Sequence, residues 1–271
     1  MAPYDKLFIY EVSGEVSVNS DIFGRHFIGC WNEGGNSFLF FSRQHDAEVS
    51  KWLGHQGRGK LVSRHVMDYR DWQAGEDLKA FRIEKLTICP SWAGTEIAEG
   101  EILIRLDPGV VFGTGLHPTT RECLKALWDV YQMDTPRKVL DIGTGTGILA
   151  ISAAKLGAQE VLAIDHNKLA VETAQRNILL NGVEDRVKVT QGEAERMGEE
   201  VADMVLANLH FTVINDLLNR EKLFSKRWIV LSGLFQGQVN GVLASLEKWQ
   251  LTVHDRMEES CWVTLVLRKI P

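Results

Sequence analysis

The stretch Lys138-Val-Leu-Asp-Ile-Gly-Thr-Gly-Thr-Gly147 decides the fold of this chain. An apolar run that predicts a strand leads into alternating glycines, and the helical pattern of Ile148 to Leu156 follows. Glycines permit a close approach to the backbone that side chains would block. Ligands of open α/β sheets bind outside the carboxyl ends of the strands, so the stretch predicts a ligand-binding turn. A tight turn without a ligand is the alternative for this motif taken by itself.

The spacing of the glycines separates two kinds of cofactor site. A dinucleotide fingerprint, G-x-G-x-x-G, would place its third glycine at position 148, where this chain has Ile148. The spacing D-x-G-x-G-x-G instead resembles the first motif of the class I S-adenosylmethionine-dependent methyltransferases. Asp141 suits that cofactor, because a carboxylate attracts the methionyl ammonium and repels a pyrophosphate. A structural role for Asp141 is nearly as well supported.

Two further predicted strands also end in polar side chains. The strand Glu160 to Asp165 ends in a carboxylate 22 positions after Gly143, near the offset at which an acidic residue binds ribose hydroxyls. The strand Ala202 to Asn208 ends in a carboxamide. Because parallel strands end at the same edge of a sheet, we expect these side chains to converge on one ligand. The alternatives are a turn former or helix cap for Asp165 and a solvated strand end for Asn208.

Strands and helices alternate through the second half of the chain. Strands are expected at Lys138–Ile142, Glu160–Asp165, Arg186–Gln191, Ala202–Asn208 and Arg227–Ser232, and helices up to about 157, at Leu169–Leu180, at about 211–222 and near 236–248. Two last strands, Leu251–Arg256 and Cys261–Arg268, are joined by a short polar turn and must be antiparallel. The pattern therefore predicts the α/β class with a C-terminal hairpin, and the resemblance to class I methyltransferases implies a Rossmann-like seven-stranded sheet in which that hairpin is reversed.

The first part of the chain predicts a smaller α+β domain. We expect a substrate-recognition domain at residues 1–95, an S-adenosylmethionine-binding methyltransferase domain at 96–271 and a linker near 94–105. In the first domain, strands are expected near Leu7–Val12, Phe27–Trp31, Phe38–Phe41, 61–66 and 86–89, with a helix at Ala47–Leu53. The turn Glu33-Gly-Gly-Asn36 indicates a hairpin. Most of the aromatic residues are expected in the core, with a recognition surface as the alternative.

Composition limits the classes of function. The chain has 271 residues, 45% of them apolar, and a formal charge of −6. Net acidity disfavours direct nucleic-acid binding, which depends on Lys and Arg, and it suits a basic protein substrate. The four cysteines lack C-x-x-C spacing, so reduced thiols and no metal site are expected. Without a signal sequence or a long apolar run, the chain is expected to be cytoplasmic and free of membrane contacts, with its oligomeric state open.

A second motif precedes the glycine-rich turn. Leu106-Asp-Pro-Gly-Val-Val-Phe-Gly-Thr-Gly-Leu-His-Pro-Thr-Thr120, together with the strand ends above, is similar to the PrmA family, the methyltransferases of large-subunit ribosomal protein L11. The similarity is most specific around 105–120 and continues to the C-terminus. It reaches more weakly to Asp71-Trp72 and Pro90-Ser-Trp92, and it does not cover residues 1–70.

The resemblance implies a set of cofactor-contacting residues and no metal. This set comprises Thr120, Gly143, Gly145, Asp141, Asp165 and Asn208, a loop of Phe112, Gly113, Thr114, Gly115 and His117 that folds over the cofactor, and Glu193 at the adenine edge. Thr120 lies where a helix opens, so its hydroxyl and nearby N–H groups can hold the cofactor's carboxylate. The alternatives are a plain helix cap for Thr120, loop structure for His117 and a solvated carboxylate for Glu193.

The implied activity is methyl transfer from S-adenosylmethionine to lysine and/or N-terminal amino groups of ribosomal protein L11. Asn208 is the predicted catalytic residue, because its carboxamide can accept a hydrogen bond from the incoming amine and orient the lone pair. The chain departs from the family's pattern at Leu209-His210-Phe211-Thr212, so the acceptor site is expected to differ. His210 could be a base, although a capping or packing role is more common for such a histidine.

Three other functions compete with this interpretation. The first is a methyltransferase for a different protein lysine or a small-molecule amine; an amide acceptor is disfavoured because release-factor enzymes carry Asn-Pro-Pro-Tyr at this position. The second is a noncatalytic cofactor-binding module, which the intact Asp141, Gly143, Asp165 and Asn208 argue against. The third, a nucleotide-dependent dehydrogenase, ranks last because of the glycine spacing.

Overall fold

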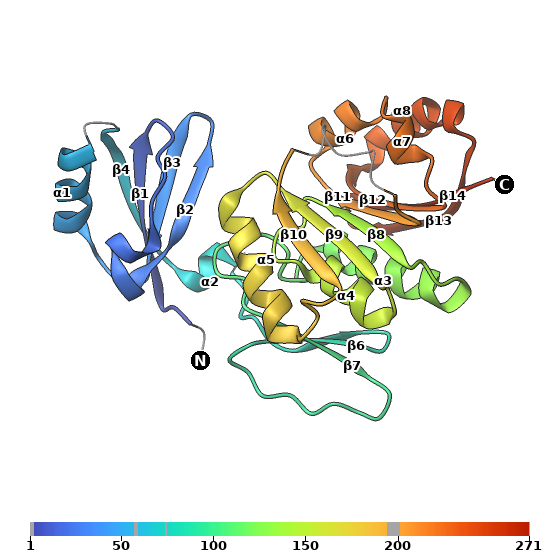
Figure 1. Cartoon of the computed structure of the whole chain (residues 1–271), viewed down its shortest axis with the longest axis horizontal. Coiled ribbons are helices and arrows are strands. Elements are labelled where there is room, and N and C mark those ends of the chain that lie inside the picture. Colours follow the sequence, from blue (N-terminus) through green and yellow to red (C-terminus); the bar gives the residue numbers. More distant parts are fainter. Residues whose placement is uncertain (1–2, 57–58, 74, 194–200, 271) are drawn as a thin grey trace. The chain divides into compact units, whose positions relative to one another are not determined.

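The chain divides into two compact units. The computed structural model describes residues 3–56, 59–73, 75–193 and 201–270, and the two units are Met1–Lys79 and Ala80–Pro271 (Figure 1). This division precedes the linker expected near 94–105. The reason is that β6 (Leu86–Pro90) pairs in parallel with β7 (Ile102–Leu106), which packs against helices of the second unit. The strand expected at 86–89 is therefore present, but it belongs to the second unit.

The first unit is an antiparallel sheet with a helix on one face. Its strands β1 (Lys6–Ser13), β2 (Phe27–Glu33), β3 (Asn36–Phe41) and β4 (Leu61–Asp68) lie in the order β2-β3-β1-β4, with helices α1 (Asp46–Gln56) and α2 (Tyr69–Trp72). The predicted hairpin turn joins β2 to β3 and has positive φ angles at Gly34 and Gly35. Phe23, Phe41 and Trp52 form an aromatic core, which confirms that most aromatic residues here are structural.

The second unit contains the predicted seven-stranded sheet. Its strands are β8 (Lys138–Ile142), β9 (Glu160–Asp165), β10 (Val187–Gln191), β11 (Met204–Asn208), β12 (Trp228–Phe235), β13 (Leu251–Glu259) and β14 (Trp262–Lys269), in the order β10-β9-β8-β11-β12-β14-β13. The strands from β8 to β12 are parallel, whereas β14 is antiparallel to both β12 and β13. The reversed C-terminal hairpin is thus confirmed. A small sheet, β5 (Phe81–Ile83), β6 and β7, completes the unit.

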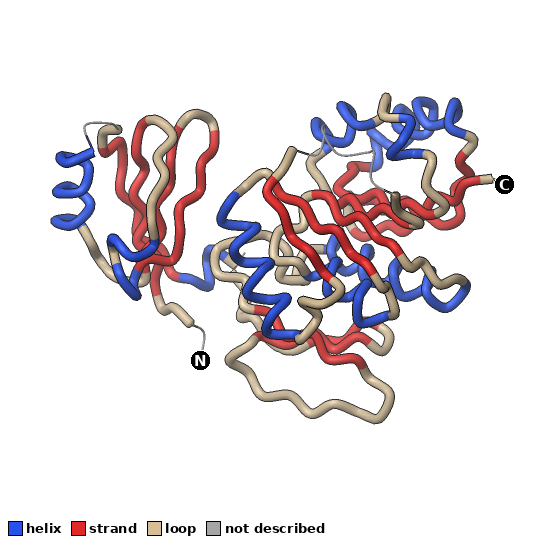
Figure 2. The backbone as a smooth tube through the Cα atoms, in the orientation of Figure 1, coloured by secondary structure: helices blue, strands red, loops and turns tan. Residues whose placement is uncertain are grey.

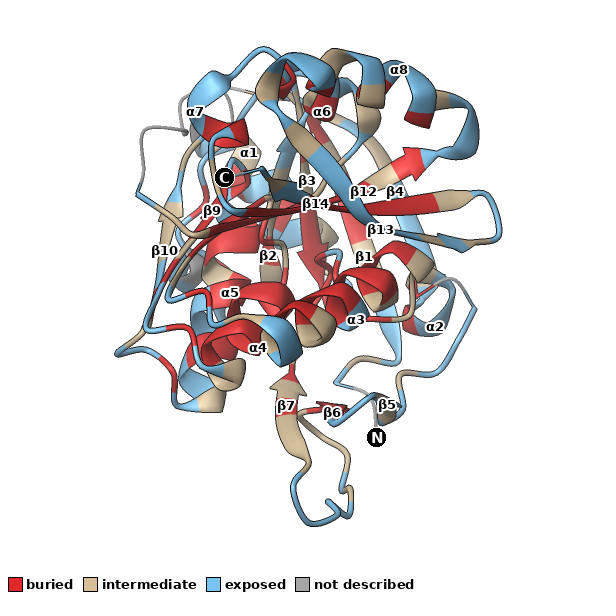
Figure 3. Cartoon of the chain, turned by 90° about the vertical axis from the view of Figure 1, so that its right-hand side faces the viewer, coloured by how far each residue is buried: buried red, intermediate tan, exposed pale blue. Residues whose placement is uncertain are grey.

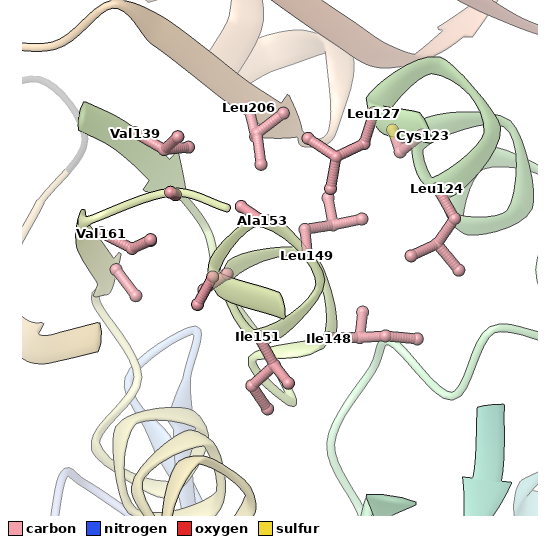
Figure 4. Packing of buried hydrophobic residues seen from close by; sticks show 14 of the residues in the cluster. Cys123, Leu124, Leu127, Val139, Ile148, Leu149, Ile151, Ala153, Val161 and Leu206 are labelled. Carbon is pink, nitrogen blue, oxygen red and sulfur yellow. The ribbon is translucent and has the colours of Figure 1, made fainter. Parts of the chain in front are cut away.

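Helices cover both faces of the large sheet. The helices α3 (Pro118–Met133), α4 (Ile148–Leu156) and α5 (Lys168–Asn181) pack on one face, and α6 (Phe211–Leu217), α7 (Glu221–Phe224) and α8 (Gln236–Leu246) pack on the other (Figures 2 and 3). On the first face Leu127, Leu149 and Leu206 interdigitate (Figure 4). One helix was expected at about 211–222. Arg220, with φ −91° and ψ 90°, instead separates α6 from α7.

Two asparagines on α5 connect the Leu106–Thr120 motif with the glycine-rich turn. Asn181 Oδ1 accepts from Arg105 N at 2.9 Å, and its Nδ2 donates to Arg105 O at 2.7 Å. One turn earlier, Asn177 Oδ1 accepts from Asp107 N at 2.8 Å, while Nδ2 donates to Asp107 O at 3.1 Å and Thr146 O at 2.9 Å. These amides satisfy backbone groups at the end of β7, as a neighbouring strand would. They therefore hold the start of residues 107–117 against the glycine-rich turn.

None of the helices within the described ranges has the length and apolar character that crossing a membrane requires.

We expect Asn177→Ala to lower the free energy of unfolding by about 1–3 kcal/mol, because Asp107 N–H and two carbonyls lose their buried partner. Urea denaturation measures the change. Gln175→Ala, at an exposed position of the same helix, is the matched control. Equal stabilities of the two variants would contradict this role for Asn177.

Candidate functional site

The glycine-rich turn, residues 143–147, joins β8 to α4 in the conformation that its sequence predicts. Gly143, Gly145 and Gly147 have φ angles of 71°, 54° and 84°, which L-residues with side chains adopt rarely. The N–H groups of Gly143 and Thr144 both donate to Ile164 O, at 2.8 and 2.9 Å. The turn is therefore fixed to the end of the neighbouring strand β9.

The chain's own segments approach these glycines closely. A Cβ atom at Gly143 would lie 2.2 Å from Leu209 Cδ2, and one at Gly145 would lie 2.5 Å from Phe112 O. Contacts this short do not occur for real side chains. The absence of side chains at Gly143 and Gly145 thus lets Leu209 and the 107–117 loop both contact the turn.

Asp141 has a structural role inside the turn. Its side chain is 1% exposed, and Thr144 Oγ1 donates to Oδ2 at 2.6 Å. Burial raises the pKa of Asp141 to about 7, although hydrogen bonds from Thr144 and from the backbone of Ala150 act in the opposite direction. The expected contact between Asp141 and a ligand's ammonium group stays a prediction beside this observed role.

Asp165 lies at the end of β9 and bridges two backbone segments. Its Oδ2 accepts from Gly145 N at 3.0 Å, and its Oδ1 accepts from Asn167 N at 2.9 Å. Asn167 in turn caps α5. The carboxylate is 8% exposed and is held at the carboxyl edge of the sheet, directly beside the turn. The strand-end placement that the sequence predicts is therefore present, and Asp165 also serves as a turn former.

The loop of residues 107–117 is fixed on the glycine-rich turn through Thr146. Thr146 N donates to Phe112 O at 3.1 Å, and its Oγ1 donates to Gly113 O at 2.7 Å. Thr114 Oγ1 accepts from Leu116 N at 3.3 Å within the loop, and a Cβ at Gly115 would lie 2.3 Å from the Phe81 ring. The loop residues of the Leu106–Thr120 motif therefore lie over the glycine-rich turn, as the resemblance implies.

Thr120 and Asn208 meet although 88 positions separate them. Asn208 Nδ2 donates to Thr120 Oγ1 at 3.4 Å. Thr120 is 1% exposed and lies inside the first turn of α3. The helix cap is His117, whose Nδ1 accepts from Thr119 N. The alternative of Thr120 as the plain cap is thus wrong, and the hydroxyl is directed to the end of β11 instead.

Aromatic side chains gather around His117, the cap of α3. The His117 ring is 5.5 Å from the Phe112 ring and 5.0 Å from the Trp262 ring, and Phe235 stacks on Trp262 at 4.3 Å. Phe112 and Phe235 are 52% and 42% exposed. Burial and the positive charge of Arg121 lower the pKa of His117, so its imidazole is neutral at neutral pH.

Several of these residues were missed in the sequence. Trp262 lies in a predicted strand, where it reads as ordinary core, whereas Phe235 lies beyond the strand expected at Arg227–Ser232, because β12 extends to residue 235. Gly233 was missed too: a Cβ there would lie 2.0 Å from Leu209 O, and its signal was a glycine interrupting the apolar strand β12. The two α5 asparagines carried a weak signal, an i, i+4 polar pair on a helix face that is otherwise apolar.

The remaining predicted residues lie as follows. His210 is exposed and caps α6, accepting from Thr212 N, which agrees with its capping alternative. Phe211 packs against the core between the sheet and α6 to α8. Glu193 is exposed just after β10, at the last position before residues that lie outside the described part. In the described ranges, no three or more His, Cys, Asp or Glu side chains form a group that could hold a metal ion.

The strand order, the reversed β14 and the turn after β8 define a class I methyltransferase fold. A family model described as "Ribosomal protein L11 methyltransferase (PrmA)" matches residues 40–270. The chain belongs to this family.

Individual relatives agree with this assignment. A ribosomal protein L11 methyltransferase of Heliobacterium modesticaldum is 35% identical over 226 residues, covering 81% of this chain and 69% of the relative. One from Desulfitobacterium hafniense is 42% identical over 183 residues, covering 67% and 58%. The crystal structure of ribosomal protein L11 methylase from Lactobacillus delbrueckii subsp. bulgaricus has a TM-score of 0.63 and 29% identity, covering 71% of this chain and all of that one. This chain spans 58% to 69% of the length of such sequence relatives.

We expect Asp141→Asn to flatten the pH dependence of stability. The folded-state pKa of about 7 lies above the usual value of 3.8, so Asp141 stabilises the fold fully below the lower value, and this contribution is lost as the pH rises through the higher one. For one group the slope is about 1.4 kcal/mol per pH unit. Thermal unfolding from pH 5 to pH 8 measures it. The exposed Asp216→Asn controls for loss of a charge, and parallel curves for wild type and Asp141→Asn would refute the assignment.

Proposed function

We propose that this chain transfers methyl groups from S-adenosylmethionine to lysine and α-amino groups of ribosomal protein L11. The hydrogen bond between Asn208 and Thr120, beside the bare backbone of the glycine-rich turn, is the observation that carries the proposal. Membership of the family supports the reaction and the substrate. A ribosomal substrate implies that the reaction takes place in the cytoplasm.

The residues at the edge of the sheet fit the cofactor chemically. When bound, S-adenosylmethionine supplies a methyl group on a sulfonium for in-line displacement. Asp165 offers a carboxylate, the group best suited to accept from both ribose hydroxyls. The Thr120 hydroxyl, in the first turn of α3 near the positive end of the helix, suits the cofactor's carboxylate. Gly143 and Gly145 contribute main chain alone at the end of β8, with Leu209 and Phe112 O lying against them. Glu193 follows β10 by two positions, where we place the adenine edge.

Asn208 orients the acceptor amine. Because its Nδ2 donates to Thr120 Oγ1, the carboxamide is held with Oδ1 as the atom that accepts from an incoming N–H. That acceptor aligns the nitrogen and its lone pair, which is the requirement of a displacement reaction. The amide cannot accept the amine's proton, so the proton passes to water.

The aromatic group helps to keep the amine neutral. At neutral pH, removing the proton costs about 4–5 kcal/mol for a lysine and about 1 kcal/mol for an α-amine. Phe112, Phe235 and Trp262 offer apolar ring surface next to His117, and partial desolvation lowers the pKa of an amine. A dedicated base is therefore not required.

The departure at Leu209-His210-Phe211-Thr212 does not require another acceptor. His210 and Thr212 form the cap of α6, and Phe211 packs in the core. The residue that faces the turn is Leu209. The altered sequence thus changes the start of a helix, and ribosomal protein L11 stays the acceptor that we propose.

We expect the wild-type chain to transfer labelled methyl groups to purified ribosomal protein L11, and Asn208→Ala to lower kcat by about tenfold to hundredfold because the amine loses its alignment. Binding of S-adenosylhomocysteine, measured by calorimetry, should change by less than about threefold, since Asn208 acts mainly on the acceptor.

Asn215→Ala, at an exposed asparagine of α6, is the matched control and should match the wild type. If other proteins in a lysate were labelled while purified ribosomal protein L11 stayed unlabelled, the proposed acceptor would be wrong. Undiminished turnover by Asn208→Ala would remove Asn208 from the mechanism.

A further inference from the structure

A buried carboxyl group that the mechanism above does not use lies on α3. Glu122 is 7% exposed, and its neighbours Cys123 and Leu124 are core residues. Its Oε2 accepts from Thr264 Oγ1 on β14 at 2.6 Å. Its Oε1 is also buried and has no hydrogen-bond partner within the described part of the chain. Burying a carboxyl group is costly, so a carboxyl at this position calls for a physical reason.

The hydrogen bond to Thr264 continues across the sheet. Thr264 Oγ1 and Ser232 Oγ, on the neighbouring strand β12, are 2.5 Å apart. Both side chains are 0% exposed. Glu122, Thr264 and Ser232 therefore form a buried polar chain that runs from α3 over β14 to β12. In a low-dielectric interior such connected bonds are stronger and more specific than isolated ones in water.

This polar chain ends beneath the predicted catalytic residue. Ser232 is paired with Asn208 in the ladder between β11 and β12, and Ser232 O accepts from Leu209 N at 3.1 Å. The next residue, Gly233, approaches so closely that a Cβ would lie 2.0 Å from Leu209 O. The backbone of residues 232–233 thus sets the position of the end of β11.

Helix α3 consequently reaches Asn208 by two routes. Thr120 accepts directly from the Asn208 side chain, and Glu122, two positions later, reaches the backbone of β12 through Thr264 and Ser232. The first route orients the carboxamide, while the second holds the strand end that carries it. Both sets of contacts must be in place for Asn208 Oδ1 to accept a hydrogen bond from an incoming amine.

We propose that Glu122 is a positioning residue for methyl transfer, acting through Thr264 and Ser232 on the strand end that carries Asn208. The inference rests on the proposed function, because it assigns Glu122 a part in that reaction. Glu122 acts through other residues and contacts neither the cofactor nor the amine.

The protonation state of Glu122 determines which hydroxyl is the donor and which is the acceptor in each hydrogen bond of this polar chain. With an ionised carboxylate, Ser232 donates to Thr264 and Thr264 donates to Glu122. A proton on Oε2 reverses both bonds, because the carboxyl then donates to Thr264 and the Ser232 proton turns toward the buried Cys123 thiol beside it. We expect the ionised form to be the active one, because it keeps the bond that the structure has, with Thr264 Oγ1 donating to Glu122 Oε2.

Groups on three elements influence that charge. Burial raises the pKa of Glu122 above its usual range, the hydrogen bond from Thr264 lowers it, Glu259 and Glu258 on β13 raise it, and Arg121 on α3 lowers it. Arg121 is itself paired with Glu259 and donates to Leu116 O at 2.7 Å. The same ion pair thus lies next to the 107–117 loop and the buried carboxyl.

Kinetics of three variants test the proposal. Glu122→Leu and Thr264→Val should each lower kcat by about tenfold, with KM for S-adenosylmethionine changed less than about twofold. The double variant should be no slower than either single one, because both interrupt the same chain. Glu122→Gln keeps the shape and the hydrogen-bonding capacity, so it should restore most of kcat. On the acidic side, the wild-type pH profile of kcat should show two protonation steps, that of the acceptor amine and that of Glu122. The profile of Glu122→Gln should keep the first and lack the second.

A second measurement does not depend on activity. Hydrogen–deuterium exchange should be faster at the Leu209 amide in Glu122→Leu and Thr264→Val than in the wild type, because its acceptor on Ser232 is no longer held. Ser152→Ala is the matched control: Ser152 is a buried serine whose Oγ donates to Ile148 O, outside this chain of bonds. It should leave both kcat and Leu209 exchange unchanged.

The outcomes separate the two proposals. Wild-type protein that methylates no ribosomal protein L11, together with faster Leu209 exchange in the variants, would overturn the proposed function and keep the positioning role at the strand end. An active wild type with normal kcat in folded Glu122→Leu or Thr264→Val would overturn the inference. Unchanged Leu209 exchange in both variants would overturn it as well. If Glu122→Leu fails to fold, Thr264→Val and Glu122→Gln still test the positioning role of Glu122.

Discussion

The rest of the site depends on the glycine-rich turn of residues 143–147. Two N–H groups of this turn share one carbonyl, Ile164 O, and a third donates to the Asp165 carboxylate. Because no side chain projects from Gly143 or Gly145, Leu209 and the carbonyl of Phe112 can lie against the turn at distances that any Cβ would exclude. A single turn therefore contacts the end of β9, the residue that follows β11 and the 107–117 loop, and it positions all three.

Three buried carboxyl groups of the second unit show how the environment gives one chemical group different roles. Asp141 is enclosed and has a raised pKa, so it behaves as a structural hydrogen-bonding group. Asp165 accepts from two backbone N–H groups at the sheet edge and is the carboxylate we assign to ribose. Glu122 is enclosed between α3 and β14, and its hydrogen bond leads through two hydroxyls to the strand that pairs with the end of β11. Burial and partners, rather than residue type, separate the three.

Local patterns predicted most of the architecture of the second unit. The short polar turn after β13 required an antiparallel β14, and the alternation of strands and helices required a parallel sheet for the others. Predictions were weaker where pairing partners are distant. The strand β6 was assigned to the first domain because its sequence does not indicate β7 as its partner, and the break between α6 and α7 at Arg220 has no glycine or proline to indicate it. The aromatic contacts of Trp262 were missed for the same reason.

By itself, the sequence determined the order of the elements, the glycine-rich turn and the polar residues at the strand ends, since hydrophobic period, glycine spacing and turn chemistry are all properties of neighbouring residues. Only the tertiary structure decided which groups meet there. The bond between Asn208 and Thr120 spans 88 positions, and that between Thr264 and Glu122 spans 142. Contacts over such separations arise from the stacking of α3 on β11, β12 and β14, which no local pattern encodes.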